Sequence, residues 1–157
     1  MRNGKVFLII GGRGTGKTTY LERLLKSKKN VVVFQLFIDE HYKFADKRLY
    51  SDFSINKSLI NKVLVIEDAT QLIGANPKND IRKIVVSSKQ MGSDVFFVFH
   101  SANVVPPYLW QLFDLALIFP SAMPKKTAGL AEYFDEIYKI VQKKPKQYRP
   151  CGVLVAH

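Results

Sequence analysis

One stretch decides the fold: Val6-Phe7-Leu8-Ile9-Ile10-Gly11-Gly12-Arg13-Gly14-Thr15-Gly16-Lys17-Thr18-Thr19, with the helix-like run Tyr20-Leu21-Glu22-Arg23-Leu24-Leu25 directly after it. An apolar strand, a turn of the form G-x-x-x-x-G-K-[ST] and a helix are the pattern of a phosphate-binding loop. The alternative is an ordinary glycine-rich turn, which does not need so many fixed residues between these flanks. We therefore expect a nucleoside triphosphate, ATP, to bind here.

The chemistry of an anion site explains the residues of this loop. Glycines let backbone N–H groups turn inward around a phosphate, and the helix that follows adds the positive end of its dipole. Lys17 can reach the β- and γ-phosphates, and the Thr18 hydroxyl can ligate Mg²⁺. The expected nucleotide-binding residues are Gly11, Gly12, Arg13, Gly14, Thr15, Gly16, Lys17, Thr18 and Thr19.

The charge of the chain suggests a polyanionic partner. Its 157 residues include 24 Lys and Arg against 13 Asp and Glu, a formal net charge of +11. Such an excess favours nucleic acid, and an acidic membrane surface is the second choice. We see no signal peptide and no apolar run long enough to span a membrane, and the single cysteine, Cys151, fits a reducing compartment. We expect a cytoplasmic protein, in the host cytoplasm if it is viral, without a membrane partner.

Apolar runs alternate with helix-like segments along the chain. This alternation predicts one α/β domain over residues 1–157, a mainly parallel sheet flanked by helices on both faces, with a basic C-terminal helix and strand over about 121–157. The expected strands are 6–10, 31–37, 63–66, 95–99, 115–119 and 152–155, and the expected helices after the phosphate loop are 79–91, 106–112 and 128–142. Residues 38–60 show no clear period and are assigned to loop and short helix.

A second motif, Val63-Leu64-Val65-Ile66-Glu67-Asp68, looks like a Walker B strand that carries an acidic pair to the edge of the sheet. One carboxylate can hold Mg²⁺ and the other can polarise the attacking water. By position, Glu67 is the metal-side acid and Asp68 activates water. A shift of one residue would instead put Asp68 on the metal, and a simple capping acid after a strand is the structural alternative.

The expected strand at 95–99 is also followed by polar residues, His100 and Ser101. The order of the segments resembles the additional-strand P-loop ATPases, in which an extra strand lies between the Walker A and Walker B strands. The resemblance implies that His100 or Ser101 senses the γ-phosphate. A histidine with an ordinary hydrogen-bonding role in the core is the alternative.

The combined motifs resemble the FtsK–HerA superfamily. They are the glycine-rich loop, the Val-Ile-Glu-Asp strand end, and Phe-His-Ser-Ala-Asn-Val-Val-Pro-Pro-Tyr-Leu followed by Leu-Ala-Leu-Ile-Phe, over roughly residues 5–120. The resemblance is strongest to the ATPase domain of terminase-like packaging motors of phages and other double-stranded DNA viruses. It implies a homo-oligomeric ring, a pentamer or hexamer, that translocates double-stranded DNA, with capsid portal or vertex proteins as further partners.

Ring ATPases of this type complete the site with a basic residue from a neighbouring subunit. Arg82 is the first candidate, with Arg48, Lys83 and Lys89 as others, and each could equally be a solvated surface charge. For DNA contact the candidates are Lys125-Lys126 and the run from Lys143 to Arg149, where Tyr148 could stack on a base. A solvated face is the alternative for both clusters.

Two other function classes start from the same loop. A small nucleoside or metabolite kinase is one, but the acidic pair fits water activation better and no arginine-rich lid is evident. A phage assembly or export ATPase resembling the toxin-like export proteins is the other, although those proteins tend to carry a transmembrane segment.

Overall fold

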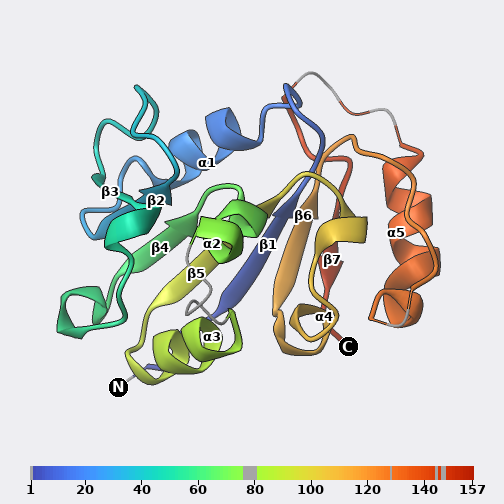
Figure 1. Ribbon diagram of the computed structural model, residues 1–157. Helices are drawn as coiled ribbons and strands as arrows, with labels where there is room; N and C mark the ends of the chain where they lie inside the picture. The colour runs from blue at the N-terminus through green and yellow to red at the C-terminus, as the bar shows by residue number, and fades with distance from the viewer. Residues whose placement is uncertain (1, 76–80, 128, 144, 146–147) are drawn as a thin grey trace.

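The computed structural model describes residues 2–75, 81–127, 129–143, 145 and 148–157. Seven strands form one sheet with the order β3-β2-β4-β5-β1-β6-β7 (Figure 1). The strands are β1 Val6–Ile10, β2 Val31–Gln35, β3 Asp46–Leu49, β4 Val63–Ile66, β5 Asp94–Phe99, β6 Leu115–Ile118 and β7 Gly152–Val155. All neighbouring pairs are parallel except β6 and β7.

Five α-helices are described, together with four short 3-10 helices. The α-helices are α1 Lys17–Leu25, α2 Ala69–Ala75, α3 Ile81–Gln90, α4 Leu109–Leu112 and α5 Phe134–Val141. The 3-10 helices are η1 Tyr50–Asp52, η2 Lys57–Leu59, η3 Ala102–Val104 and η4 Ala131–Tyr133. The mainly parallel sheet flanked by helices is the expected fold class.

The position of β5 confirms the additional-strand arrangement. Its residues pair with β1 on one side, Val6 with Val95, and with β4 on the other, Val63 with Asp94. The strand of the phosphate loop and the strand of the acidic pair are therefore second neighbours. Parallel strands end on the same edge, so the ends of β1, β4 and β5 lie together there.

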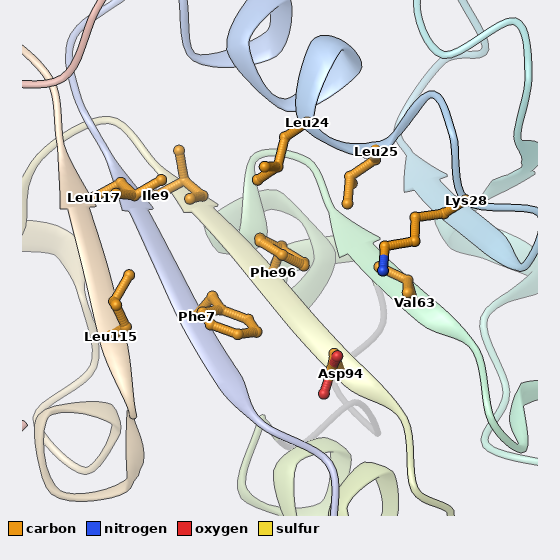
Figure 2. Close-up of a pocket in the computed structure, with 10 residues that line it drawn as sticks. All are labelled: Phe7, Ile9, Leu24, Leu25, Lys28, Val63, Asp94, Phe96, Leu115 and Leu117. Carbon is orange, nitrogen blue, oxygen red and sulfur yellow. The ribbon is translucent and has the colours of Figure 1, made fainter. Parts of the chain in front are cut away.

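Each strand presents one row of side chains to each face, and the two faces are covered unequally. Helices α2 to α5 cover one face, over a core that includes Leu8, Phe34, Leu64, Phe97 and Ile118. On the other face, α1 packs Leu21 and Leu25 over Ile9, Val65 and Val98. Figure 2 shows that Phe7, Phe96 and Leu115 line a groove on this face, below Leu24 and Leu25 of α1.

Three expectations about the elements need correction. β2 ends at Gln35, because Leu36 and Phe37 are exposed, Phe37 to 78%. Residues 38–60 contain the strand β3, which escaped notice because Asp-Lys-Arg-Leu is a charged edge sequence without an apolar run. The short helix α2 directly after Asp68 was not expected. The predicted starts of the helices at 79–91 and 128–142 include residues 79, 80 and 128, which lie outside the described residues.

Gly4, in the segment before β1, gives a test of packing. An added Cβ at this buried position would lie 1.9 Å from the carbonyl oxygen of Ser93. Because that neighbour is backbone, we expect Gly4→Ala to lower the free energy of unfolding by about 1–3 kcal/mol. The measurement is urea denaturation.

Gly12→Ala is the matched control, since the nearest atom to its added Cβ is at 3.5 Å. It should change the stability by less than about 1 kcal/mol. Equal stability of the two variants would contradict the packing at Gly4.

Candidate functional site

The loop between β1 and α1 has the geometry of an anion cradle. Gly14 and Gly16 have φ values of 72° and 94°, in the left-handed region that glycine adopts without strain. The Thr15 hydroxyl donates to the carbonyl of Gly12 at 2.7 Å and closes the turn. The N–H groups of the first turn of α1, which begins at Lys17, are at the mouth of this loop.

Lys17 is buried in its own loop, with 8% of its surface exposed. Its Nζ donates to the carbonyl oxygens of Gly11 and Gly12, the latter at 2.8 Å. Burial lowers the pKa of Lys17, and the charges of Glu67 and Asp68 oppose that effect. A phosphate at the loop would oppose it further, because a nearby negative charge favours the charged ammonium.

Glu67 follows β4 and faces the phosphate loop. Its Oε1 lies 3.4 Å from Oγ1 of Thr18, and the hydroxyl of Tyr42 donates a hydrogen bond to the same oxygen. Burial raises the pKa of Glu67, and the hydrogen bonds from Tyr42 and Thr18 partly offset that rise. Thr18 and Glu67 thus form a hydroxyl–carboxylate pair at the edge of the sheet; that this pair is the metal side stays a prediction.

Asp68 occupies a different position from Glu67. Its φ of 49° turns the chain sharply before α2, and the hydroxyl of Tyr50 donates to its backbone carbonyl at 3.3 Å. Its carboxylate Oδ1 lies 3.4 Å from Nε2 of His100, at the end of β5. The two acids of the motif are therefore distinct: Glu67 adjoins the phosphate loop and Asp68 adjoins the end of the inserted strand.

His100 and Ser101 differ in what they contact. Nδ1 of His100 is buried and has no hydrogen-bond partner among the residues that the structure describes. Ser101 is partly buried and precedes η3, without capping it through its side chain. The contact with Asp68 involves His100. A sensor role for either residue stays a prediction.

The oxygen groups around Thr18 fit Mg²⁺. A pocket beside the phosphate loop is lined by Thr18, Gln35, Asp39, Glu67 and Asp68 among others. Oε1 of Gln35 is buried there and accepts no hydrogen bond from any described residue. Within the same described ranges, no three His, Cys, Asp or Glu residues are grouped as a metal centre. Mg²⁺ that is bound mainly by phosphates and waters needs only one or two protein oxygens, and Thr18 and Glu67 present oxygens of this kind.

The expected trans-acting residues lie outside this pocket. The guanidinium of Arg82 on α3 lies 4.6 Å from the ring centroid of Tyr108. Arg48 on β3 bonds to Asp46 at 2.8 Å and to Ser58 at 3.0 Å. Lys83 is exposed and Lys89 is partly buried, both on α3, while Arg13 is exposed on the loop itself. A role for Arg82, Arg48, Lys83 or Lys89 in a neighbouring subunit's site stays a prediction, and so does a role for Arg13 in binding nucleotide.

The two basic clusters are separate surfaces. Lys125 and Lys126 are exposed after β6, and Lys126 lies 5.8 Å from the ring centroid of Phe134. In the second cluster Lys143 and Arg149 are exposed, and Lys144, Lys146 and Gln147 lie outside the described residues. Tyr148, a candidate for stacking on a base with ordinary packing as the alternative, lies beside the phosphate loop with Gly14 to Thr19.

Sequence reasoning missed the residues that position Glu67. Tyr42 is fully buried with a φ of 55°, and Gln35 is buried at the end of β2, where its Nε2 donates to Asp39 at 3.2 Å. Tyr42 comes from the segment that had been assigned to loop. The one signal in the sequence was that Tyr42 is an aromatic residue in the polar segment that follows β2 at the carboxyl edge of the sheet.

The raised pKa of Glu67 predicts a change in stability on Glu67→Gln. A carboxyl whose folded-state pKa lies above its ordinary 4.5 lowers the stability at neutral pH, and that penalty disappears as the pH falls below 4.5. Glutamine keeps an oxygen that can accept from Tyr42 and Thr18. We therefore expect Glu67→Gln to be more stable than wild type at pH 7, with the difference lost near pH 4.

Urea denaturation at the two pH values measures this difference. Glu40→Gln, at an exposed acid, is the control and should change the stability by less than about 0.5 kcal/mol at both. A Glu67→Gln protein that is less stable than wild type at pH 7 would contradict the environment described for this carboxylate.

Comparison with known proteins gives structural neighbours only. No protein-family model matches the sequence, and no curated protein matches it. The genome packaging NTPase B204 of Sulfolobus turreted icosahedral virus 2, in complex with sulfate, has a TM-score of 0.71 and 16% identity, over 99% of this chain and 93% of that one. Its complex with ATP-gammaS gives 0.66 and 18%, over 99% and 94%.

The N-terminal domain of zonular occludens toxin from Neisseria meningitidis is more distant. It has a TM-score of 0.51 and 14% identity, over 73% of this chain and 76% of that one. At these identities the similarity concerns the fold. The chain therefore has the P-loop NTPase fold of a viral genome packaging NTPase, as its resemblance to the FtsK–HerA packaging ATPases predicted.

Proposed function

We propose that this protein is a Mg²⁺-dependent ATPase that couples ATP hydrolysis to the translocation of double-stranded DNA, in the packaging of a viral genome. The observation that carries the hydrolytic part is the 3.4 Å approach of Thr18 Oγ1 to Glu67 Oε1, beside the buried Lys17. This is the constellation in which a P-loop binds a metal–triphosphate complex. The second acid, Asp68, remains available for water.

The residues of the chain divide the work of hydrolysis. The N–H groups of the loop and Lys17 bind the β- and γ-phosphates, and Thr18 and Glu67 hold the metal. Mg²⁺, when bound, neutralises charge on the phosphate oxygens. Asp68 orients a water for attack on the γ-phosphorus and accepts its proton, while the bond from that phosphorus to the bridging oxygen of ADP breaks.

His100 connects this chemistry to the inserted strand. It ends β5, which pairs with both β1 and β4, and its Nε2 contacts the carboxylate of Asp68. Loss of the γ-phosphate changes the charge that Asp68 faces, and His100 is placed to transmit that change to η3 and beyond. Ser101 is the alternative sensor.

DNA as the partner is supported by charge and by fold. The net charge is +11, and Lys125, Lys126, Lys143 and Arg149 are exposed, as a sequence-independent contact with phosphates requires. The structural neighbours include a DNA-packaging ATPase from Sulfolobus turreted icosahedral virus, with a TM-score of 0.60. The proposed partners are double-stranded DNA and, at the capsid, portal or vertex proteins.

An oligomeric ring is supported by an exposed apolar loop beside the site. Leu36, Phe37 and Ile38 follow β2, with 45%, 78% and 52% of their surfaces exposed, next to the pocket that contains Glu67. Contiguous exposed apolar side chains mark interaction surfaces. A neighbouring copy that covers this loop, in a ring of five or six, could also supply Arg82 or another cation to the site.

A phage assembly or export ATPase is the second candidate, favoured by the similarity to the zonular occludens toxin domain. Within the described residues, no helix has the length and apolar character to cross a membrane. Flotation with liposomes separates this candidate from the motor, because only the export protein is expected to float.

The principal test of the proposal is ATP hydrolysis with and without double-stranded DNA, with the oligomeric mass recorded in parallel. We expect wild type to hydrolyse ATP, DNA to stimulate turnover, and Lys17→Ala to lower kcat/KM at least 100-fold, since an electrostatic contact with the transferred phosphate is lost. Lys57→Ala, at an exposed lysine on η2, is the control. A monomer that is indifferent to DNA would contradict the motor, and phosphorylation of a nucleoside would indicate the kinase.

The hydrogen bond from Tyr42 to Glu67 predicts a shift in the pH profile. This bond lowers the pKa of Glu67, so Tyr42→Phe raises the pKa further. Because metal binding needs the ionised carboxylate, the acid limb of the kcat/KM profile should move to higher pH.

Tyr50→Phe is the control for this shift, because the hydroxyl of Tyr50 donates to the backbone carbonyl of Asp68 and not to a carboxylate. It should leave the acid limb where wild type has it. A Tyr42→Phe profile that coincides with wild type, or moves to lower pH, would contradict the role assigned to this bond.

A further inference from the structure

The topology of the sheet brings the C-terminal segment back to the phosphate loop. β7 runs antiparallel to β6, with Gly152 opposite Ile118, so β7 begins at the edge where β6 and β1 end. The residues that lead into it, Tyr148 to Cys151, must pass that edge, and the N–H of Cys151 donates to the carbonyl of Ile118 at 2.6 Å. Figure 1 shows this segment passing beside the loop that follows β1.

The contact between this segment and the loop is direct. A Cβ added at Gly16 would lie 2.7 Å from Cα, Cβ and Cδ1 of Tyr148. Tyr148 itself has a φ of 61°, a left-handed value that a tyrosine adopts rarely. The Cα of Tyr148 and the first atoms of its side chain pack on the backbone of Gly16, so the start of this side chain is held against the loop.

Two residues from outside the loop, His41 and Tyr148, line the same pocket as Gly14 to Thr19. Nδ1 of His41 is hydrogen-bonded to Oε1 of Glu22, and the backbone N–H of His41 donates to the carboxylate of Asp39. The residue Tyr148 is 47% exposed, so it offers aromatic surface to a ligand in this pocket. When the N–H groups of the loop bind the phosphates, the sugar and base of the nucleotide extend out of the loop along the residues that line this pocket.

We propose that Tyr148 is a nucleotide-binding residue, which stacks on the base or ribose of the nucleotide whose phosphates the loop holds. This rests on the proposed function, because it requires a nucleotide at the loop. The assignment differs from the expectation that Tyr148 contacts DNA. A base that reaches this ring belongs to the ligand of the phosphate loop, since the ring packs on Gly16. Every base has a π-face, so such a contact raises affinity with little selectivity among bases.

Comparison of a nucleotide with a phosphate chain that lacks a base tests the proposal. The probes are the non-hydrolysable analogue AMPPCP and inorganic tripolyphosphate, each with Mg²⁺, and the measurement is isothermal titration calorimetry on the full chain. The variants are Tyr148→Ala and Tyr148→Phe, with Tyr138→Ala as control at an exposed tyrosine on α5.

The expected result is a loss that is confined to the nucleotide. Tyr148→Ala should weaken AMPPCP binding about tenfold, the range for one base on one aromatic ring being about 5- to 150-fold, and should leave tripolyphosphate binding unchanged. Tyr148→Phe should retain wild-type affinity for both probes, because the ring is kept, and so should Tyr138→Ala.

Three results would overturn the proposal, and they differ from failure of the proposed function. Equal weakening of both probes by Tyr148→Ala would mean that the residue only supports the loop. Tighter binding of both would mean that its ring obstructs the phosphates. Unchanged AMPPCP binding would mean that the ring makes no contact. Wild type that binds neither probe would overturn the proposed function, and this inference with it.

Discussion

The partly buried carboxylate of Glu67 is the constraint on which the carboxyl edge of the sheet depends. Burial favours its protonated form, while a site for Mg²⁺ needs the ionised form. The hydroxyls of Tyr42 and Thr18 partly offset this effect of burial, because both hydrogen-bond to the carboxylate and neither brings a charge. Tyr42 lies in the segment after β2, and Thr18 lies on α1. These two segments and β4 must therefore all be folded before the carboxylate of Glu67 is held in this position.

The position of β5 separates the two tasks of the acidic pair. In the sheet, β5 lies between β4 and β1. With β5 between them, Glu67 meets Thr18 while Asp68 meets His100. Two adjacent residues therefore have different neighbours, which supports the different roles proposed for them. The arrangement leaves one acid beside Thr18, where Mg²⁺ is proposed to bind, and the other at the strand end that is proposed to report the γ-phosphate.

The sequence predicted the central strands because they are buried on both faces and therefore appear as continuous apolar runs. β4, Val63–Ile66, was predicted at its observed bounds. β3 was missed because a charged edge strand lacks that signal, and β2 was extended into Leu36 and Phe37, whose apolar character serves an exposed loop. Among the site residues, the glycine-rich loop and the acids have motifs. Tyr42, Gln35 and Tyr148 have none, because their places follow from long-range packing that no local pattern records.

The return of the C-terminal segment has a consequence for the order of folding. Gly16 precedes nearly the whole chain and Tyr148 follows it, so their contact closes a loop that spans most of the protein. Contacts of such long sequence separation form late, because the entropy of loop closure opposes them until the intervening sheet exists. During synthesis the phosphate loop emerges before the segment at Tyr148, so this contact forms only later. The pocket lined by Gly14 to Thr19, His41 and Tyr148 is thus complete only after β7 has docked against β6.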